Sequence, residues 1–247
     1  MKKPVKKILA TIGAVIGLLV LLCGIFIAKI HFETSKMSPL KTQKVIDGVV
    51  AVQDKFVNLF LIENGSSYIA VDAGNTADHI QHELQVLGID PKTVTSVFLT
   101  HSDADHTGAL ELFYNAVIYL SKAEEQMING QTHRFLFLKN KFKGKYELLE
   151  DNQLLNLSGL RVKAISTPGH TPGSMCFLIN DTFLFTGDSM GLKNGKTTEF
   201  NDLFNMDTQT QKISLKKLAD LPAAAYIFTA HYGFTVQGQD PFSTWKK

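Results

Sequence analysis

The sequence predicts an α/β fold with mixed β-sheets, preceded by one N-terminal transmembrane helix. Apolar runs rich in β-branched and aromatic residues alternate with segments of helical periodicity along residues 45–247, a pattern typical of α/β domains. Short turn-forming segments join several neighbouring runs and predict hairpins within the same sheets. The length of 247 residues allows one sizeable core, and the net charge of +2 favours no particular charged partner.

An uninterrupted apolar run covers residues 8–28 and contains no charged residue. It is close to the roughly 20 residues that an α-helix needs to span a bilayer. A buried core helix explains the run poorly, because no charged residue breaks it and Thr11 is its only hydroxyl residue. A cleaved signal peptide is the other alternative, but its apolar stretch usually has about 7–15 residues, and the segment ending at Ala28 is a weak cleavage site. We therefore expect an uncleaved anchor at 8–28, between a basic tail at 1–7 and a polar, mobile connector at 29–44.

Lysines lie on both sides of this expected anchor. Those of the tail favour a cytoplasmic N-terminus by the positive-inside rule. The lysines after the anchor reduce this bias: Lys29, Lys36, Lys41 and Lys44. We expect a single-pass protein of the cell membrane, with a globular domain at 45–247 outside the cytoplasm.

The first half of the globular domain begins with a hairpin signal. Two β-rich runs, 56–62 and 67–72, flank Asn64-Gly65, and this dipeptide favours the tight turn of a hairpin. Residues 76–87 have helical periodicity, and Gly88 is placed to end that helix. The other elements expected here are a buried strand at 94–99, a helix at 107–113 and a strand at 117–120.

The second half contains another hairpin signal, in which β-rich residues 174–179 and 182–186 flank Asn180-Asp181. The other elements expected here are an alternating strand at 160–165, a helix at 208–221 and a last core strand at 225–229. The two cysteines do not indicate a disulfide. Cys23 lies in the expected anchor, and Cys176 lies in an apolar strand, where we expect a buried, non-catalytic thiol.

Residues 126–151 interleave basic and aromatic side chains: His133, Arg134, Phe135, Phe137, Lys139, Lys141, Phe142, Lys143, Lys145 and Tyr146. A solvated face over an ordinary helix or loop explains this pattern. The alternative is a lid or wall beside a site that favours an anionic or amphiphilic small molecule. Nucleic acid is not expected as a partner, because the chain is barely basic and lacks a recognition domain.

The most informative segment is the loop expected after the strand at 94–99. It holds two imidazoles and two carboxylates within six positions: His101, Asp103, Asp105 and His106. Imidazole and carboxylate bind divalent metals such as zinc, and a strand delivers such a cluster to an edge of its sheet. Further along, each of three similar residues follows or ends an apolar run beside a glycine: His170, Asp188 and His231.

Each of these residues alone has an ordinary explanation. A single histidine after a strand is more often a hydrogen-bonded structural residue than a metal ligand, and aspartate near a turn usually serves the turn. The combination is what indicates a metal site. The remaining histidines lack this placement, and we expect two of them on the surface of the helix at 76–87: His79 and His82.

Together these residues resemble the metallo-β-lactamase superfamily, whose first motif reads H-x-H-x-D-H and is followed by a later His, a later Asp and a last His. The order, the spacing and the flanking glycines match, and Asp72-Ala73-Gly74 looks like the family's early Asp-Gly element. The resemblance covers roughly residues 45–235. It implies a four-layer αβ/βα sandwich with metals at one edge of two facing sheets, and a catalytic domain at 45–247.

The resemblance implies two divalent metal ions, with zinc expected and manganese or iron as alternatives. One ion would be bound by His101, Asp103 and His170, and the other by Asp105, His106 and His231, with Asp188 between them. Asp105 and Asp188 are the implied catalytic residues. Such an ion pair can lower the pKa of a shared water toward about 7, giving a hydroxide nucleophile, and can polarise the substrate's oxygen.

The implied activity is that of a membrane-anchored, metal-dependent hydrolase of an ester, lactone, thioester, β-lactam or phosphodiester bond. The β-lactam is not favoured, since fold membership says little about substrate. Asp103 departs from the family pattern, which has histidine there, and a carboxylate makes that site more oxygen-rich. This departure leaves two alternatives: an iron-dependent oxidoreductase of the same fold, weakened by the lack of a flavodoxin-like segment, and a non-catalytic metal-binding protein.

Overall fold

The computed structural model describes residues 3–134, 140 and 144–246. The chain forms two compact units, Met1–Met37 and Ser38–Lys247. The first unit is one helix, and the second contains all of the sheets.

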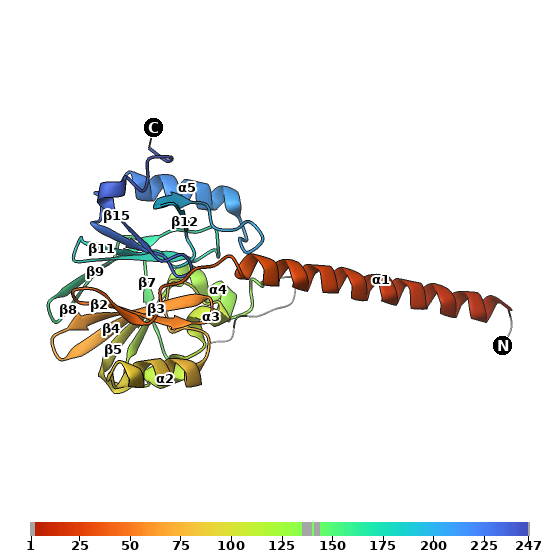
Figure 1. The fold of residues 1–247 in the computed structure, drawn as a ribbon, viewed down its shortest axis with the longest axis horizontal. Helices are drawn as coiled ribbons and strands as arrows, with labels where there is room; N and C mark the ends of the chain where they lie inside the picture. The colour runs from red at the N-terminus through yellow and green to blue at the C-terminus, as the bar shows by residue number, and fades with distance from the viewer. Residues whose placement is uncertain (1–2, 135–139, 141–143, 247) are drawn as a thin grey trace. The chain divides into compact units, whose positions relative to one another are not determined.

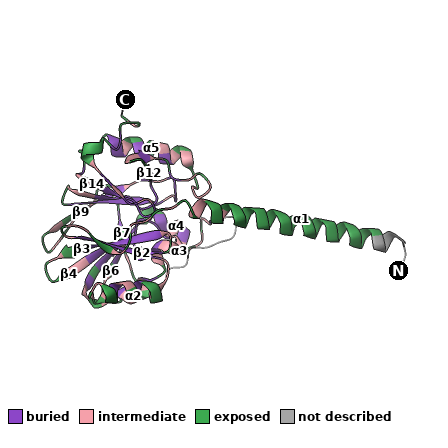
Figure 2. Ribbon diagram, viewed as in Figure 1, coloured by how far each residue is buried: buried purple, intermediate pink, exposed green. Residues whose placement is uncertain are grey.

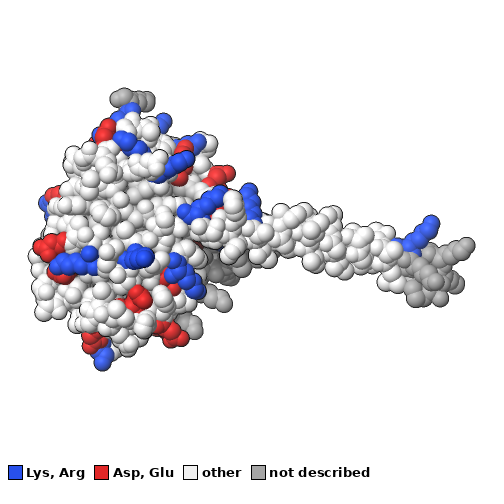
Figure 3. All heavy atoms as spheres, viewed as in Figure 1, with Lys and Arg blue, Asp and Glu red and all other residues white. Residues whose placement is uncertain are grey.

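Helix α1 (Lys3–Thr34) makes up the first unit (Figure 1). Its part from Lys7 to Thr34 is long and apolar enough to cross a membrane, with a mean hydropathy of 2.8. The apolar residues from Ile8 to Ala28 are exposed (Figure 2), and the middle of the helix carries no charge (Figure 3). Length and composition therefore fit either a membrane span or a signal sequence.

The first residues of the connector expected at 29–44 continue helix α1. The helix continues to Thr34 because the chain contains neither glycine nor proline between Gly24 and Pro39 to end it sooner. Beyond it, the chain is bound to the globular unit. The Ser38 amide donates to the His231 carbonyl (2.8 Å), and the Asn58 side chain bonds both backbone groups of Leu40 (2.8 Å each).

The first sheet of the globular unit has the strand order β1-β2-β3-β4-β5-β6-β7. The pairs from β1 to β4 are antiparallel and those from β4 to β7 are parallel, so the sheet is mixed. Its strands are β1 (Gln43–Ile46), β2 (Val49–Asp54), β3 (Val57–Asn64), β4 (Ser67–Val71), β5 (Val94–Phe98), β6 (Val117–Ser121) and β7 (Glu147–Leu149).

The second sheet has the order β15-β14-β11-β10-β9-β8 and is also mixed, since β11 and β14 are parallel and the other pairs antiparallel. Its strands are β8 (Leu154–Leu157), β9 (Leu160–Ser166), β10 (Met175–Ile179), β11 (Phe183–Phe185), β14 (Tyr226–Phe228) and β15 (Phe234–Val236). Strands β12 (Gly191–Lys193) and β13 (Lys196–Thr198) form a separate hairpin.

The sheets face each other, with helix α2 (Ala77–Val86) on the outer side of the first and α5 (Thr208–Ala219) on the outer side of the second (Figure 1). Three apolar clusters fill the three interfaces of these four layers. Figure 2 shows that the buried residues lie mainly on the strands and on the inner sides of the layers. In the central cluster, Phe98 of the first sheet packs on Phe177 of the second at 5.2 Å between ring centroids. The expected αβ/βα sandwich with two mixed sheets is confirmed.

The helix expected at 107–113 is wrong in its bounds. Helix α3 (Ala104–Thr107) begins earlier, and a separate 3₁₀ turn, η2 (Leu110–Phe113), follows it. The break lies at Gly108, whose amide donates to the Gly74 carbonyl (2.8 Å). A Cβ at Gly108 would lie 2.0 Å from the Asn75 carbonyl oxygen, so the backbones approach too closely there for any other residue.

Candidate active site

Four segments that end strands of the two sheets meet at one edge of the sandwich. The loop and helix after β5 carry His101, Asp103, Asp105 and His106. The segments after β9, β11 and β14, all in the second sheet, carry the other predicted residues: His170, Asp188 and His231. All seven are brought together, and the histidines and Asp188 are buried, with exposures of 4% or less.

One group of donors, hereafter the Asp105 set, consists of Asp105, His106, Asp188 and His231. His231 Nε2 and His106 Nε2 lie 3.0 and 3.5 Å from Asp188 Oδ1, and 3.6 and 3.7 Å from Asp105 Oδ2. Ligand bonds of about 2.0–2.1 Å in a tetrahedron place neighbouring donors about 3.3 Å apart, so these four separations are those of metal ligands. The donor atoms of Asp105, His106 and His231 all lie within 4.8 Å of one another.

Two buried polar atoms of the Asp105 set make no hydrogen bond within the described part of the chain. Among the described residues, the buried His106 Nε2 and Asp188 Oδ1 have no hydrogen-bond partner. Burying polar atoms without partners is costly. A cation bound between them would satisfy both atoms, which is a second reason why this set fits a metal ion.

Hydrogen bonds behind the Asp105 set fix its two imidazoles. Asp72 Oδ2 lies 2.8 Å from His106 Nδ1, and the Phe56 carbonyl oxygen lies 2.6 Å from His231 Nδ1. Both partners can only accept, so each Nδ1 carries the proton and donates it, and each Nε2 faces the other donors of the set. The sequence signal for Asp72 was its place in the Asp-Gly element, whereas no sequence signal pointed to Phe56.

Carboxylates give the Asp105 set a negative field. Burial lowers the pKa of His106, but the charges of Asp72, Asp188 and Asp105 outweigh it and raise that pKa well above its usual value. Asp188 shows the reciprocal effect: burial raises its pKa, yet His231, His106 and His170 hold it well below the usual range. The pocket therefore favours added positive charge, which a metal ion provides.

The other group, hereafter the Asp103 set, consists of His101, Asp103 and His170. Asp103 Oδ2 lies 3.5 Å from His101 Nε2 and 3.2 Å from His170 Nε2, again the spacing of metal ligands. Here, however, a side chain is already between the donors. The Arg134 guanidinium contacts both Asp103 oxygens, and its Nη2 lies 2.6 Å from His170 Nε2. Arg134 thus blocks a metal ion from Asp103 and His170. The buried His101 Nε2 has no hydrogen-bond partner among the described residues, and it groups with donor atoms of His106 and Asp188 within 4.8 Å.

The position of Arg134 distinguishes between the two explanations of segment 126–151 for this one residue. It is 8% exposed, so a solvated face is the wrong description for this residue. Its Nη1 donates to the Phe204 carbonyl at 2.6 Å, which ties it to a segment 70 residues further along the chain. Lys145 is exposed. The remaining lysines singled out in this segment, at 139, 141 and 143, lie outside the described residues, as do the phenylalanines at 135, 137 and 142.

Glu124 joins the loops that carry the two histidines of the Asp103 set. Its buried carboxylate accepts from the Ser102 amide (2.9 Å) and hydroxyl (2.7 Å), from the Thr171 hydroxyl (2.7 Å) and from the Gly173 amide (3.0 Å). Burial raises its pKa, although these bonds oppose the rise. Nothing in the sequence separated Glu124 from ordinary surface glutamates, because its partners lie far away in the chain.

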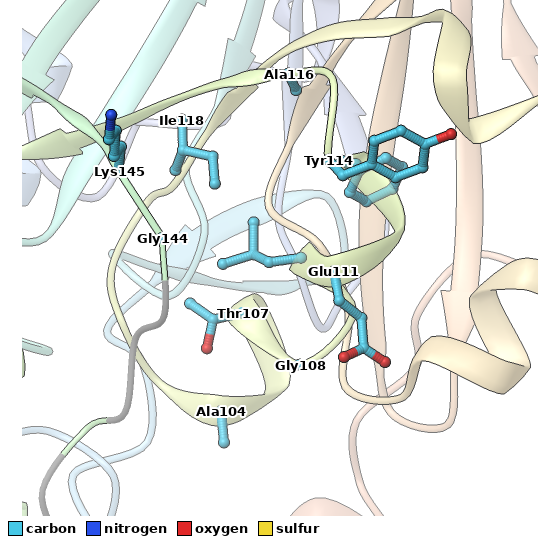
Figure 4. Close-up of a pocket in the computed structure, with 11 residues that line it drawn as sticks. Ala104, Thr107, Gly108, Glu111, Tyr114, Ala116, Ile118, Gly144 and Lys145 are labelled. Carbon is cyan, nitrogen blue, oxygen red and sulfur yellow. The ribbon is translucent and has the colours of Figure 1, made fainter.

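A cavity of about 550 Å³ lies beside helix α3, lined by its first and last residues, Ala104 and Thr107, and by side chains from η2 and β6 (Figure 4). Lys145 and Glu111 stand on opposite sides of it (Figure 4). None of the metal-donor residues lines it, so it is separate from the Asp105 and Asp103 sets. As expected, His79 and His82 are exposed on α2 and Cys176 is buried.

A comparison with protein-family models matches residues 52–231 to the metallo-beta-lactamase superfamily. The chain belongs to this superfamily. Its homologues include the "Probable polyketide biosynthesis zinc-dependent hydrolase" of Bacillus velezensis, 30% identical over 67% of each chain. Another is the "Atrochrysone carboxyl ACP thioesterase" of Aspergillus chevalieri, 26% identical over 64% of this chain. The match covers 51% of that thioesterase, so it spans between about half and two thirds of these relatives.

Solved structures of the superfamily share the fold. A B3 metallo-beta-lactamase with an active-site glutamic acid superposes with a TM-score of 0.66, at 16% identity over 85% of this chain and 87% of the other. A metallo-beta-lactamase family protein from Thermus thermophilus gives 0.62, at 19% identity over 81% and 78%. These matches establish the sandwich fold, and the superfamily membership makes the protein a metallo-hydrolase.

Proposed function

We propose that this metallo-hydrolase binds its catalytic metal at the Asp105 set and hydrolyses a thioester or a related ester at the surface of a membrane, to which α1 anchors it. The observation that carries the proposal is the spacing of 3.0–3.7 Å between the imidazoles of His106 and His231 and the carboxylates of Asp105 and Asp188. Among the described residues, the buried His106 Nε2 and Asp188 Oδ1 have no hydrogen-bond partner. A zinc ion bound there would polarise the substrate's carbonyl oxygen and lower the pKa of water.

The chain's own residues have separate tasks in this proposal. Asp72 and the Phe56 carbonyl orient His106 and His231, so that both Nε2 atoms face the ion. Asp188 also reaches the Asp103 set: its Oδ1 faces His231, and its Oδ2 lies 3.4 Å from His170 Nε2. Asp105, whose side chain is 23% exposed, is the most accessible donor of its set and is placed to orient the attacking water.

The substrate proposal rests on the relatives. The names of two of them refer to a zinc-dependent hydrolase of polyketide biosynthesis and to an ACP thioesterase. A thioester is therefore the first bond to test, ahead of esters, lactones, phosphodiesters and β-lactams. The iron-dependent alternative depends on the extra carboxylate of Asp103, and that carboxylate has another use here as the partner of Arg134.

The test is a substrate panel on the full chain in detergent micelles: a short acyl thioester, an aryl ester, a lactone, a phosphodiester and a β-lactam, each with and without zinc. We expect thioester hydrolysis that a chelator abolishes. His106→Ala should lower turnover at least about a hundredfold, since the metal contributes several kcal/mol to catalysis. His79→Ala, on the exposed face of α2, is the matched control. Chelator-resistant turnover, or full activity in His106→Ala, would refute the proposal.

A further inference from the structure

Arg134 places a permanent positive charge inside the Asp103 set. Its Nε donates to Asp103 Oδ1 and Oδ2 (3.2 and 3.0 Å), and its Nη2 contacts Asp103 Oδ2 and His170 Nε2. The Phe204 carbonyl accepts from Nη1. An arginine that is 8% exposed and bound on three of its nitrogens is a built part of the site.

We propose that the Arg134 guanidinium takes the place of one of the two metal ions, so that the protein retains a single divalent ion at the Asp105 set. A second ion enters the Asp103 set only when Arg134 is displaced. This inference rests on the proposed function insofar as the Asp105 set binds metal.

The Asp103 set cannot bind the Arg134 guanidinium and a metal ion at the same time. A metal ion needs the lone pairs of Asp103 Oδ2 and His170 Nε2 at about 2.0–2.2 Å. Those atoms already face Arg134 Nη2, which is 2.6 Å from the imidazole nitrogen. The guanidinium has donors and no lone pair to offer a metal ion, so it must move away before a second ion can bind.

Charge acts in the same direction. The single carboxylate of the Asp103 set is already paired with the Arg134 guanidinium, which also contacts His170 Nε2. A second divalent ion entering this set would lie directly beside that positive charge and be repelled by it.

The pairing also accounts for the aspartate at position 103, where the family resemblance predicts histidine. A carboxylate offers two oxygens to the fork of a guanidinium, whereas an imidazole offers one lone pair. Asp103 uses both oxygens, and the Asn140 side chain donates to one of them at 2.9 Å. Asp103 and Arg134 therefore act as a pair. The aspartate stands where the family has a metal-binding histidine, and it binds the guanidinium of Arg134 instead of a metal ion.

The decisive experiment counts metal without using activity. The full chain in detergent micelles is dialysed against a buffer that fixes free zinc, and zinc per chain is measured by native mass spectrometry. We expect one ion in the wild type and in Arg161→Ala, a control that removes an exposed surface arginine. We expect two ions in Arg134→Ala, with the affinity for the second at least about tenfold tighter than in the wild type.

Two ions of similar affinity in the wild type would overturn the inference, and so would one ion in a folded Arg134→Ala variant. No zinc in folded wild type would instead refute the proposal that the Asp105 set binds metal. If Arg134→Ala does not fold, the Asp103→His/Arg134→Ala double variant should bind two ions. Cobalt titration of the wild type, followed by visible absorption, should saturate at one equivalent, and saturation at two would also overturn the inference.

Discussion

Asp72 links two of the candidate metal ligands through one buried carboxylate. Its Oδ2 accepts from His106 Nδ1, and its Oδ1 accepts from the amide of Thr100 (2.8 Å), whose hydroxyl also donates to it. That hydroxyl in turn lies 3.1 Å from Nδ1 of His101. A residue that touches no metal therefore sets the direction of an imidazole in each donor set.

We predict that Asp72→Asn weakens zinc binding about 10- to 100-fold, the usual cost of losing such a supporting partner, while the fold is retained. Competition with a chromophoric chelator measures the affinity. Asp78→Asn, an exposed position on α2, is the control. An unchanged zinc affinity in Asp72→Asn would mean that His106 does not depend on this bond.

Cys176 offers a test by pH. Burial raises the pKa of its thiol to about 11, although Thr167 and Ser189 oppose the rise. Because the thiolate is the reactive form, we predict that iodoacetamide labels Cys176 hardly at all at pH 8 in the folded protein. In urea the thiol should return to its ordinary pKa of about 8.5, and mass spectrometry should show rapid labelling. Equal rates in both states would contradict the burial of this strand.

Residue types at strand ends were enough to select all seven residues that meet at the sandwich edge. Their supporting partners were beyond the reach of sequence reasoning. Glu124 acts on Thr171 from a distant segment, and Arg134 lies in a run of basic residues that resembles an ordinary solvated face. Burial separates Arg134 from its basic neighbours in sequence, and burial depends on tertiary contacts.

At the scale of single elements, the turn before Asp188 is constrained both in backbone conformation and in space. Gly187 has a φ of +51°, in the left-handed region, and a Cβ there would lie 2.5 Å from Cβ of Thr100. The turn after β11 can therefore approach the loop after β5 only with glycine at this position.

We predict that Gly187→Ala destabilises the protein by more than about 1 kcal/mol, because it combines backbone strain with a steric clash. Thermal unfolding of the two alanine variants provides the measurement. Gly238→Ala, where a Cβ meets nothing within 4 Å, is the matched control and should leave the melting temperature nearly unchanged. Equal melting temperatures for the two variants would contradict this account of the turn.

Elements with strong local signals were predicted correctly. Asn64-Gly65 marks the turn between β3 and β4, and apolar periodicity marks α2 and α5. The bounds of α3 were missed because a distant contact decides them: the close packing of Gly108 against Asn75 splits the expected helix.

For the whole molecule, the first prediction concerns the membrane. If α1 is an uncleaved anchor, the full chain should remain in the membrane fraction after an alkaline wash, and a variant that begins at Met37 should be released. Protease added to intact cells should digest the globular unit if the N-terminus is cytoplasmic, as the positive-inside rule predicts. Protection of the globular unit in intact cells would reverse the orientation, and a shortened mature chain would indicate a signal sequence.

The Asp105 set takes His106 from the first sheet and His231 from the second, more than a hundred residues later in the chain. An ion that needs both can bind only after the two sheets have docked, which we expect to be a late event. Interactions made after the rate-limiting step slow unfolding and leave the folding rate almost unchanged. Zinc at about 100 times its dissociation constant stabilises the native state by about 2.7 kcal/mol. In denaturant-jump experiments zinc should therefore lengthen the lifetime of the native state about a hundredfold. The ion would then slow the unfolding of the completed fold without speeding its formation.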